Sequence, residues 1–165
     1  MSTYILGLDP GGTTGIALMG FYDDSFKLIS TWQLGDPDFV VEKILSIVEE
    51  SKQLAQEGDE FVLLCESFEV RPDVIHPDEA PKFIIKDLER VVEPKHPIRY
   101  QTASYAKGGV PPTKNGTRDR LHAFGVHQRG MRHANDAIRH CITYAIDKLQ
   151  HKPTIVKGWG LPGAK

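Results

Sequence analysis

Four side chains that lie far apart in the sequence have the types and spacing needed to hold divalent metal ions. Asp9 follows the largely apolar run 4–8, Glu66 ends the apolar run in LLCESF, and His133 and Asp136 lie three residues apart. Residues at that spacing face the same side of a helix. A carboxylate at the end of a buried strand is costly unless it is paired or binds a metal. Carboxylates with an imidazole suit Mg²⁺ or Mn²⁺, and two such ions about 4 Å apart can support phosphodiester hydrolysis.

Each of these residues also has a purely structural interpretation. Asp9 lies in an Asp-Pro-Gly sequence, where its side chain can stabilise a turn. Glu66 can cap the turn or helix that follows its strand. His133 can be an ordinary residue at the start of a helix, and Asp136 can favour the positive end of the helix dipole. The combination of all four in one short chain favours the functional interpretation.

Strands and helices that can position these residues are visible in the hydrophobic pattern. Strands are expected at 4–9, 14–21 and 26–34, with a hairpin signal at 23–25, then a near-continuous apolar strand at 60–68 and a short one at 97–102. A helix is expected to begin at Asp36-Pro37, with Val40, Ile44, Ile47 and Val48 on one face, and to end by Gly58.

Two further helices are predicted in the second half of the chain. Residues 82–93 place Phe83, Ile84, Leu88, Val91 and Val92 on one face, and residues 131–149 place Ala134, Ile138, Cys141 and Ala145 in a core stripe. The segment 69–81 is proline-rich and expected to be a loop, and 105–130 is expected to be loop with some helix. The order βββαβαβα predicts a mixed sheet with helices on its faces, in one domain.

Charge is divided unevenly between the two halves of the chain. Residues 1–81 hold 4 Lys and Arg against 16 Asp and Glu, and residues 82–165 hold 16 against 6. This asymmetry points to an anionic partner, unless the two halves interleave in the fold and neutralise each other. No leader and no 18-residue apolar run is apparent, so neither export nor a membrane span is expected. Cys65 and Cys141 lie in apolar surroundings, which favours reduced core thiols of a cytoplasmic protein.

Together, these motifs resemble those of the RuvC-like Holliday-junction resolvases of the RNase H-like nuclease superfamily, and of phage-encoded members in particular. GLDPGGTTG matches the family's acid before a glycine turn and a Thr-Gly pair, LLCESF matches its second acid, and HANDA at 133–137 matches its terminal-helix motif. The resemblance runs from residue 4 to about 147. It implies an RNase H-like α/β fold for residues 1–150, with a mixed five-stranded sheet flanked by helices. Residues 151–165 are expected to be a C-terminal tail, and its two prolines and three glycines indicate that it packs loosely or not at all.

The resemblance also implies an activity. It is that of a crossover junction endodeoxyribonuclease of DNA recombination and repair, which cleaves four-way junctions, or forks or flaps. Asp9, Glu66, His133 and Asp136 are then the catalytic residues and the ligands of two Mg²⁺ ions per site, with Mn²⁺ able to substitute. A homodimer is implied because a four-way junction offers two symmetric scission points. The protein is then cytoplasmic, in the host cell if it is phage-encoded.

Weaker matches suggest residues that contact DNA. Ser104 and Lys107 in ASYAK match a Ser-x-x-Lys segment of the family, and Arg118 and Arg120 occupy the place of its basic helix. Such residues contact the DNA backbone, which fixes position without reading sequence; the alternative is a solvated charged loop. Phe68 is a candidate for stacking on a base. It lies one residue away from the family's position, and a core phenylalanine is the alternative.

Two other classes of function compete with the nuclease. GLDPGGTTG also resembles the first phosphate loop of actin-like sugar kinases, although a second such loop is missing from the 165 residues. A non-catalytic DNA-binding descendant of the nuclease fold would keep the basic second half without the chemistry. Such a protein is expected to have lost at least one of the metal-binding acids, and the sequence retains all of them.

Overall fold

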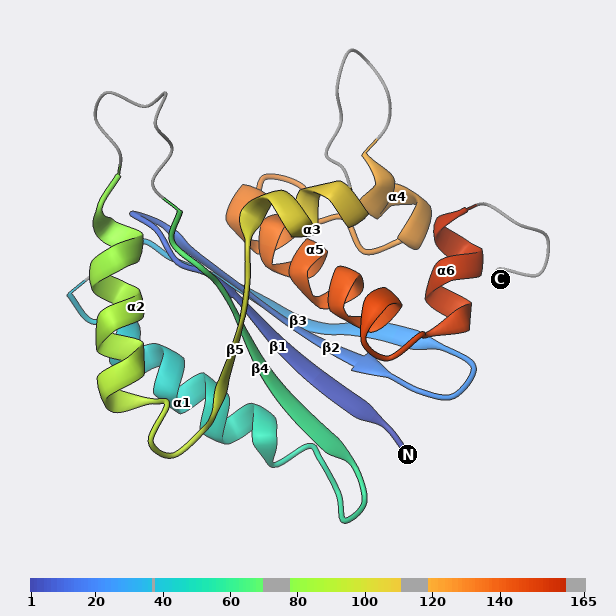
Figure 1. The fold of residues 1–165 in the computed structure, drawn as a ribbon, viewed down its shortest axis with the longest axis horizontal. Helices are drawn as coiled ribbons and strands as arrows, with labels where there is room; N and C mark the ends of the chain where they lie inside the picture. The colour runs from blue at the N-terminus through green and yellow to red at the C-terminus, as the bar shows by residue number, and fades with distance from the viewer. Residues whose placement is uncertain (37, 70–77, 111–118, 160–165) are drawn as a thin grey trace.

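The computed structural model describes residues 1–36, 38–69, 78–110 and 119–159, and its centre is a five-stranded mixed sheet (Figure 1). The strands are β1 (Thr3–Asp9), β2 (Thr14–Phe21), β3 (Phe26–Leu34), β4 (Glu60–Glu66) and β5 (Ile98–Gln101). Their order in the sheet is β3-β2-β1-β4-β5. The first three strands form an antiparallel meander, and β4 and β5 add to β1 in parallel. The predicted RNase H-like sheet arrangement is confirmed.

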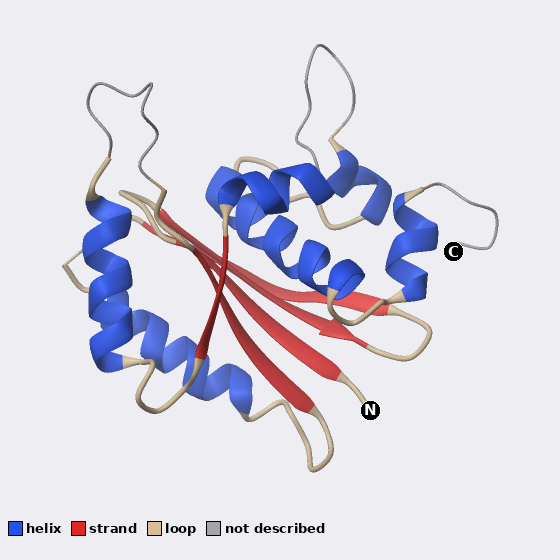
Figure 2. Ribbon diagram, viewed as in Figure 1, coloured by secondary structure: helices blue, strands red, loops and turns tan. Residues whose placement is uncertain are grey.

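Helices cover both faces of this sheet (Figure 2). They are α1 (Val40–Lys52), α2 (Ala80–Val91), α3 (Ala103–Gly109), α4 (Arg120–Phe124), α5 (Arg132–Asp147) and α6 (Lys152–Gly158). Helices α1 and α2 lie on one face, and α5 lies on the other with the three short helices α3, α4 and α6 around it (Figure 1).

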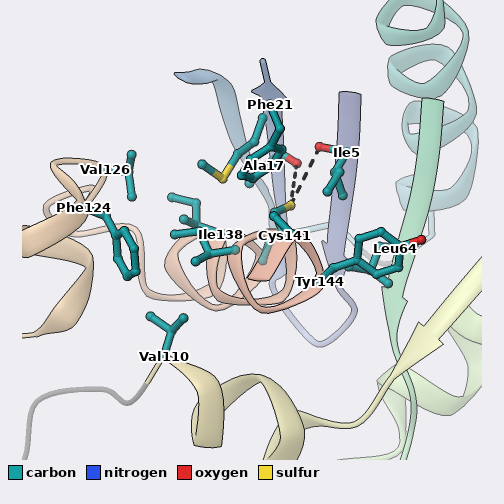
Figure 3. Close-up of a cluster of buried hydrophobic side chains, with 14 of the residues drawn as sticks. Ile5, Ala17, Phe21, Leu64, Val110, Phe124, Val126, Ile138, Cys141 and Tyr144 are labelled. Carbon is teal, nitrogen blue, oxygen red and sulfur yellow. Dashed lines mark hydrogen bonds between the residues drawn. The ribbon is translucent and has the colours of Figure 1, made fainter. Parts of the chain in front are cut away.

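Alternating side chains on the strands build one hydrophobic core on each face. On β1, Ile5 belongs to the core shared with α5, whereas Leu6 and Leu8 belong to the core shared with α1 and α2. In the first core the Cys141 thiol donates to the Ile5 and Ala17 carbonyls over 3.8 and 3.7 Å (Figure 3). Cys65 is buried as well, and both cysteines are free, as the sequence indicates.

Two glycines allow α5 to lie directly against the strands. A Cβ on Gly15 of β2 would come within 2.0 Å of the carbonyl carbon of His133, and one on Gly7 of β1 within 2.7 Å of the Ala137 oxygen. Real Cβ atoms do not approach other atoms so closely, so these positions require glycine while the helix stays in place. The Gly15 contact brings the first turn of α5 next to the end of β1.

Two expectations about packing are wrong. Phe83 is 60% exposed, because α2 buries Ile84 and Leu88, four residues apart, and Phe83 lies beside that stripe. The part of the tail at Lys152–Gly158 forms α6 instead of packing loosely. It packs on α4 and α5 with Thr154 fully buried. Nε2 of His151, the residue before α6, lies 2.6 Å from the carbonyl oxygen of Tyr22. Of the helices within the described ranges, none has the length and apolar character to cross a membrane.

Candidate active site

Asp9 and Glu66 end two neighbouring parallel strands at the same edge of the sheet. Leu8 and Cys65 are the last residues that pair between β1 and β4, and Asp9 and Glu66 each come next in their own strand. Alternation along each strand places both acids on the face covered by α5, and both make contacts with that helix. Asp9 is buried, with 7% of its surface exposed.

The first turn of α5 brings His133 and Asp136 to this edge. The side chain of Gln33 on β3 accepts from the backbone N–H groups of His133 and Ala134, over 3.0 and 3.4 Å, and so satisfies donors that a helix start leaves unpaired. Nδ1 of His133 lies 3.1 Å from Oδ2 of Asp9. This contact joins the GLDPGGTTG motif to the HANDA motif, although Asp9 and His133 lie 124 positions apart.

The carboxylates of this site act on one another. The pKa of Asp9 is raised to about 8. Burial is the largest cause, the negative charges of Glu66 and Asp136 add to it, and the positive charges of Lys107 and Arg132 oppose it. The structure therefore brings three of the four predicted residues into electrostatic contact, and the fourth, His133, bonds to Asp9.

Helix α5 supplies two more partners for these acids, which the sequence analysis did not identify. Nε2 of His140 lies 2.8 Å from Oε2 of Glu66, and Nε of Arg139 donates to Oδ1 of Asp136 over 3.3 Å. Arg139 also forms an ion pair with Asp119. A sequence signal for these partners exists, because Arg139 and His140 interrupt the apolar run AIRHCIT. They lie three and four residues after Asp136 and so face the same side of the helix as Asp136.

The donor set has the chemistry of a site for hard divalent cations. Three carboxylates and an imidazole match the preferences of Mg²⁺ and Mn²⁺, and a cation bound there would offset the repulsion that, after burial, contributes to the raised pKa of Asp9. In the described part of the chain, no three His, Cys, Asp or Glu side chains are arranged closely enough to hold one ion together. The fit is therefore one of donor type and charge, and metal binding stays a prediction.

The residues predicted to contact DNA are not all at this site. Lys107 of α3 is next to it, with Nζ 3.9 Å from Oδ2 of Asp136. Ser104 and Arg120 are exposed and line a separate groove along α3, α4 and α6. Phe68 is half-buried, and neither hydrophobic core of the described residues includes it. Arg118 lies outside the described residues.

A groove of about 490 Å³ extends from Asp136, and four of the ten described residues that line it are basic. Lys107, His127, Arg132 and Arg139 all contribute to it. Cations beside a carboxylate cluster match a ligand that carries phosphates, since the ligand's charge must be balanced outside the acids themselves.

Comparison with known proteins relates this chain to others by structure. No family model matches it, and no curated protein sequence does. The RuvC structure of Thermus thermophilus superposes with a TM-score of 0.62 at 14% identity, over 92% of this chain and 98% of that one. A structure of T. thermophilus RuvC in complex with a Holliday junction substrate gives 0.60 at 14% identity, over 90% and 96%. The chain therefore has a RuvC-like fold of the RNase H-like type.

Proposed function

We propose that this protein is a divalent-metal-dependent, structure-selective endodeoxyribonuclease that cleaves four-way junctions or other branched DNA. The observation that carries the proposal is the meeting of Asp9, Glu66 and Asp136, from three separate elements, in one site where burial and mutual repulsion raise the pKa of Asp9 to about 8. The RuvC-like fold supports it, and one of the two RuvC structures is a complex with a Holliday junction substrate.

The proposed ligands of the metal are Asp9, Glu66 and Asp136, with His133 as a further ligand or as the group that positions the attacking water. We expect two Mg²⁺ ions per site, with Mn²⁺ able to replace them. When bound, such ions neutralise the scissile phosphate and supply a water of lowered pKa. Nδ1 of His133 holds Asp9 at 3.1 Å, and its Nε2 has no hydrogen-bond partner among the described residues.

Basic residues around the acids are proposed to hold the DNA backbone. Lys107 lies at the border between the acid cluster and the basic groove, so its ammonium group can bind a phosphate oxygen next to the scissile bond. Ser104, Arg118 and Arg120 are proposed to contact phosphates further away. Phe68, which follows Glu66 by two residues, is proposed to stack on a base at the branch point.

The proposed assembly is a homodimer, because a four-way junction has two symmetric scission points that a two-fold protein can match. Light scattering of the purified protein, with and without junction DNA, tests this. We further propose that residues 1–150 are the nuclease domain, and that the protein is phage-encoded and acts in the cytoplasm of the host.

A cleavage panel of synthetic DNAs tests the proposed function. Four-way junctions, forks, flaps and linear duplexes are incubated with wild type, Asp9→Asn and the exposed-site control Asp24→Asn, in Mg²⁺, in Mn²⁺ and in EDTA. We expect wild type and Asp24→Asn to cut branched DNA only with a divalent ion, and Asp9→Asn to bind the DNA without cutting it. Nicking by Asp9→Asn at the wild-type rate in Mg²⁺ rules the assignment out.

The same panel distinguishes the competing functions. Wild-type protein that binds branched DNA but leaves it intact in both metals is the non-catalytic binding protein. Hydrolysis of ATP without cleavage of any DNA points to the actin-like phosphotransferase.

A further inference from the structure

Helix α5 buries two adjacent polar side chains at its centre, Arg139 and His140, which are 3% and 1% exposed. Removing a guanidinium or an imidazole from water costs several kcal/mol unless partners replace the lost hydrogen bonds. The residues around them, Ile138, Cys141 and Ile142, show that this part of the helix is otherwise apolar core. Packing alone gives no reason for two polar residues here, so their contacts must.

Each of the two side chains contacts a different acid of the proposed metal site, and each takes one carboxylate oxygen. His140 Nε2 lies 2.8 Å from Oε2 of Glu66, whose Oε1 has no hydrogen-bond partner in the described ranges. Arg139 Nε donates to Oδ1 of Asp136 over 3.3 Å, and Oδ2 of Asp136 has only the longer contact to Lys107. One oxygen of each acid is therefore held by α5.

The far side of the imidazole is anchored on the neighbouring strand. His140 Nδ1 lies 2.9 Å from Oε1 of Gln101, and Gln101 on β5 is the register partner of Glu66 on β4. The amide Nε2 of Gln101 is buried without a partner among the described residues. Turning this amide end for end pairs Nε2 of Gln101 with the acceptor Nδ1 of a neutral imidazole, whose Nε2–H then donates to Glu66.

The far side of the guanidinium is anchored on two other segments. Arg139 donates to both carboxylate oxygens of Asp119, the residue before α4, and to the Val110 carbonyl at the end of α3 over 3.0 Å. A guanidinium fixed by this planar set of acceptors has little freedom to rotate. Its Nε therefore points at Asp136 from a fixed position.

We propose that Arg139 and His140 are positioning residues, which hold one oxygen of Asp136 and of Glu66 and leave the other oxygen of each acid to bind the metal ion. This inference rests on the proposed function, because it concerns the same site. Outer partners of metal ligands typically contribute 10- to 100-fold in metal affinity. At position 140 the proposal requires a side chain that donates a hydrogen bond to Glu66. A polar side chain that cannot reach Glu66 should not replace His140.

Variants at position 140 separate the hydrogen bond from the packing. In His140→Gln the amide can reach Glu66 in place of Nε2, in His140→Asn the shorter amide reaches only toward Gln101, and His140→Leu has no donor. Mn²⁺ affinity is measured by isothermal titration calorimetry on the full chain without DNA, and thermal unfolding is measured in EDTA. We expect His140→Gln to bind Mn²⁺ within about threefold of wild type, and His140→Leu and His140→Asn to bind at least about tenfold more weakly.

Stability in EDTA reports on packing and should not follow the metal affinity. Equal Mn²⁺ affinity of wild type, His140→Leu and His140→Asn overturns the proposal for His140. If His140→Leu does not fold, the comparison of His140→Gln with His140→Asn decides: a tenfold difference supports the role, and equal affinities contradict it.

At position 139 the variant Arg139→Lys keeps a cation for Asp119, but a single ammonium group cannot hold Asp119 and Asp136 in the same geometry. We expect Mn²⁺ affinity to fall at least about tenfold, while the surface control Arg90→Met on α2 changes nothing. Wild-type affinity in Arg139→Lys overturns the proposal for Arg139. Failure of the proposed function is a different result, because then the wild-type protein itself neither binds Mn²⁺ nor cuts branched DNA.

Discussion

Replacing Asp9 by Asn should stabilise the metal-free protein, although the same change abolishes the proposed activity. Burial and the charges of Glu66 and Asp136 raise the pKa of Asp9 to about 8 in the folded state, from an ordinary value of 3.8. A carboxyl group with a raised pKa in the folded state favours unfolding as the pH rises between these two values, because the unfolded chain releases its proton first. An asparagine has no proton to release, and its amide can still bond to His133.

The size of this effect follows from the two pKa values. Each pH unit between about 4 and 8 costs about 1.4 kcal/mol of folding free energy, which sums to about 4 kcal/mol at pH 7. Because the neighbouring acids can take up part of the proton and move apart, we expect Asp9→Asn to raise the free energy of unfolding at pH 7 by about 2–4 kcal/mol. For a chain of 165 residues this corresponds to a rise in Tm of about 4–16 °C.

Thermal unfolding of wild type and Asp9→Asn in EDTA, at pH 5, 6, 7 and 8, measures this difference. The advantage of the variant should grow from pH 5 to pH 7. Asp24→Asn, at an exposed turn position, should change the free energy of unfolding by no more than about 0.5 kcal/mol at any pH. Added Mg²⁺ should raise the Tm of wild type, since ions that bind the folded state stabilise it, and should have much less effect on Asp9→Asn.

An Asp9→Asn protein that is no more stable than wild type at pH 7, with a difference that does not change with pH, contradicts this prediction. That result would mean that burial and the neighbouring acids do not raise the pKa of Asp9. The proposed cation site would then lose its electrostatic basis.

Three other predictions test separate parts of the account. Gly15→Ala should destabilise the fold by about 3 kcal/mol or more, because its Cβ would lie 2.0 Å from the backbone of α5. Gly35→Ala, at a position with open space around it, is the control in the same thermal unfolding experiment. Equal Tm values of the two variants would contradict the close approach of α5 to Gly15. Lys107→Met should weaken binding to branched DNA and reduce the slope of log Kd against log salt concentration by about 1; an unchanged slope removes Lys107 from the phosphate contacts. Burial raises the pKa of both thiols, that of Cys141 to about 12. Neither cysteine should therefore react with a thiol reagent at pH 8 until guanidinium unfolds the chain, and rapid labelling of the folded protein would contradict this.

Much of the sheet could be predicted because its strands have strong local signals. The meander of β1 to β3 follows from apolar runs separated by turn residues, and β4 is a continuous buried strand. The acids at the strand ends could be found for the same reason, because a carboxylate directly after a buried run stands out. That Asp9 and Glu66 lie side by side depends on the parallel pairing of β1 and β4, which the expected order of elements allowed but did not prove.

The surroundings of α5 could not be predicted in the same way. Helical periodicity indicates one buried stripe, but α3, α4 and α6 cover the outer side of this helix, so Arg139 and His140 are buried as well. The covering helices have five to seven residues each, too few to show a period. The partners of the two buried side chains come from β4, β5, α5 itself and the starts and ends of short helices, and no local pattern brings these together.

Crystals of the protein soaked in Mn²⁺ would show whether Asp9, Glu66 and Asp136 form a site for divalent ions. Anomalous scattering near the manganese absorption edge locates the ion independently of any assumption about the site. We expect an anomalous peak within coordination distance of oxygens from at least two of the three acids, and loss of this peak in Asp9→Asn. Well-diffracting wild-type crystals in millimolar Mn²⁺ with no peak at these carboxylates would contradict it.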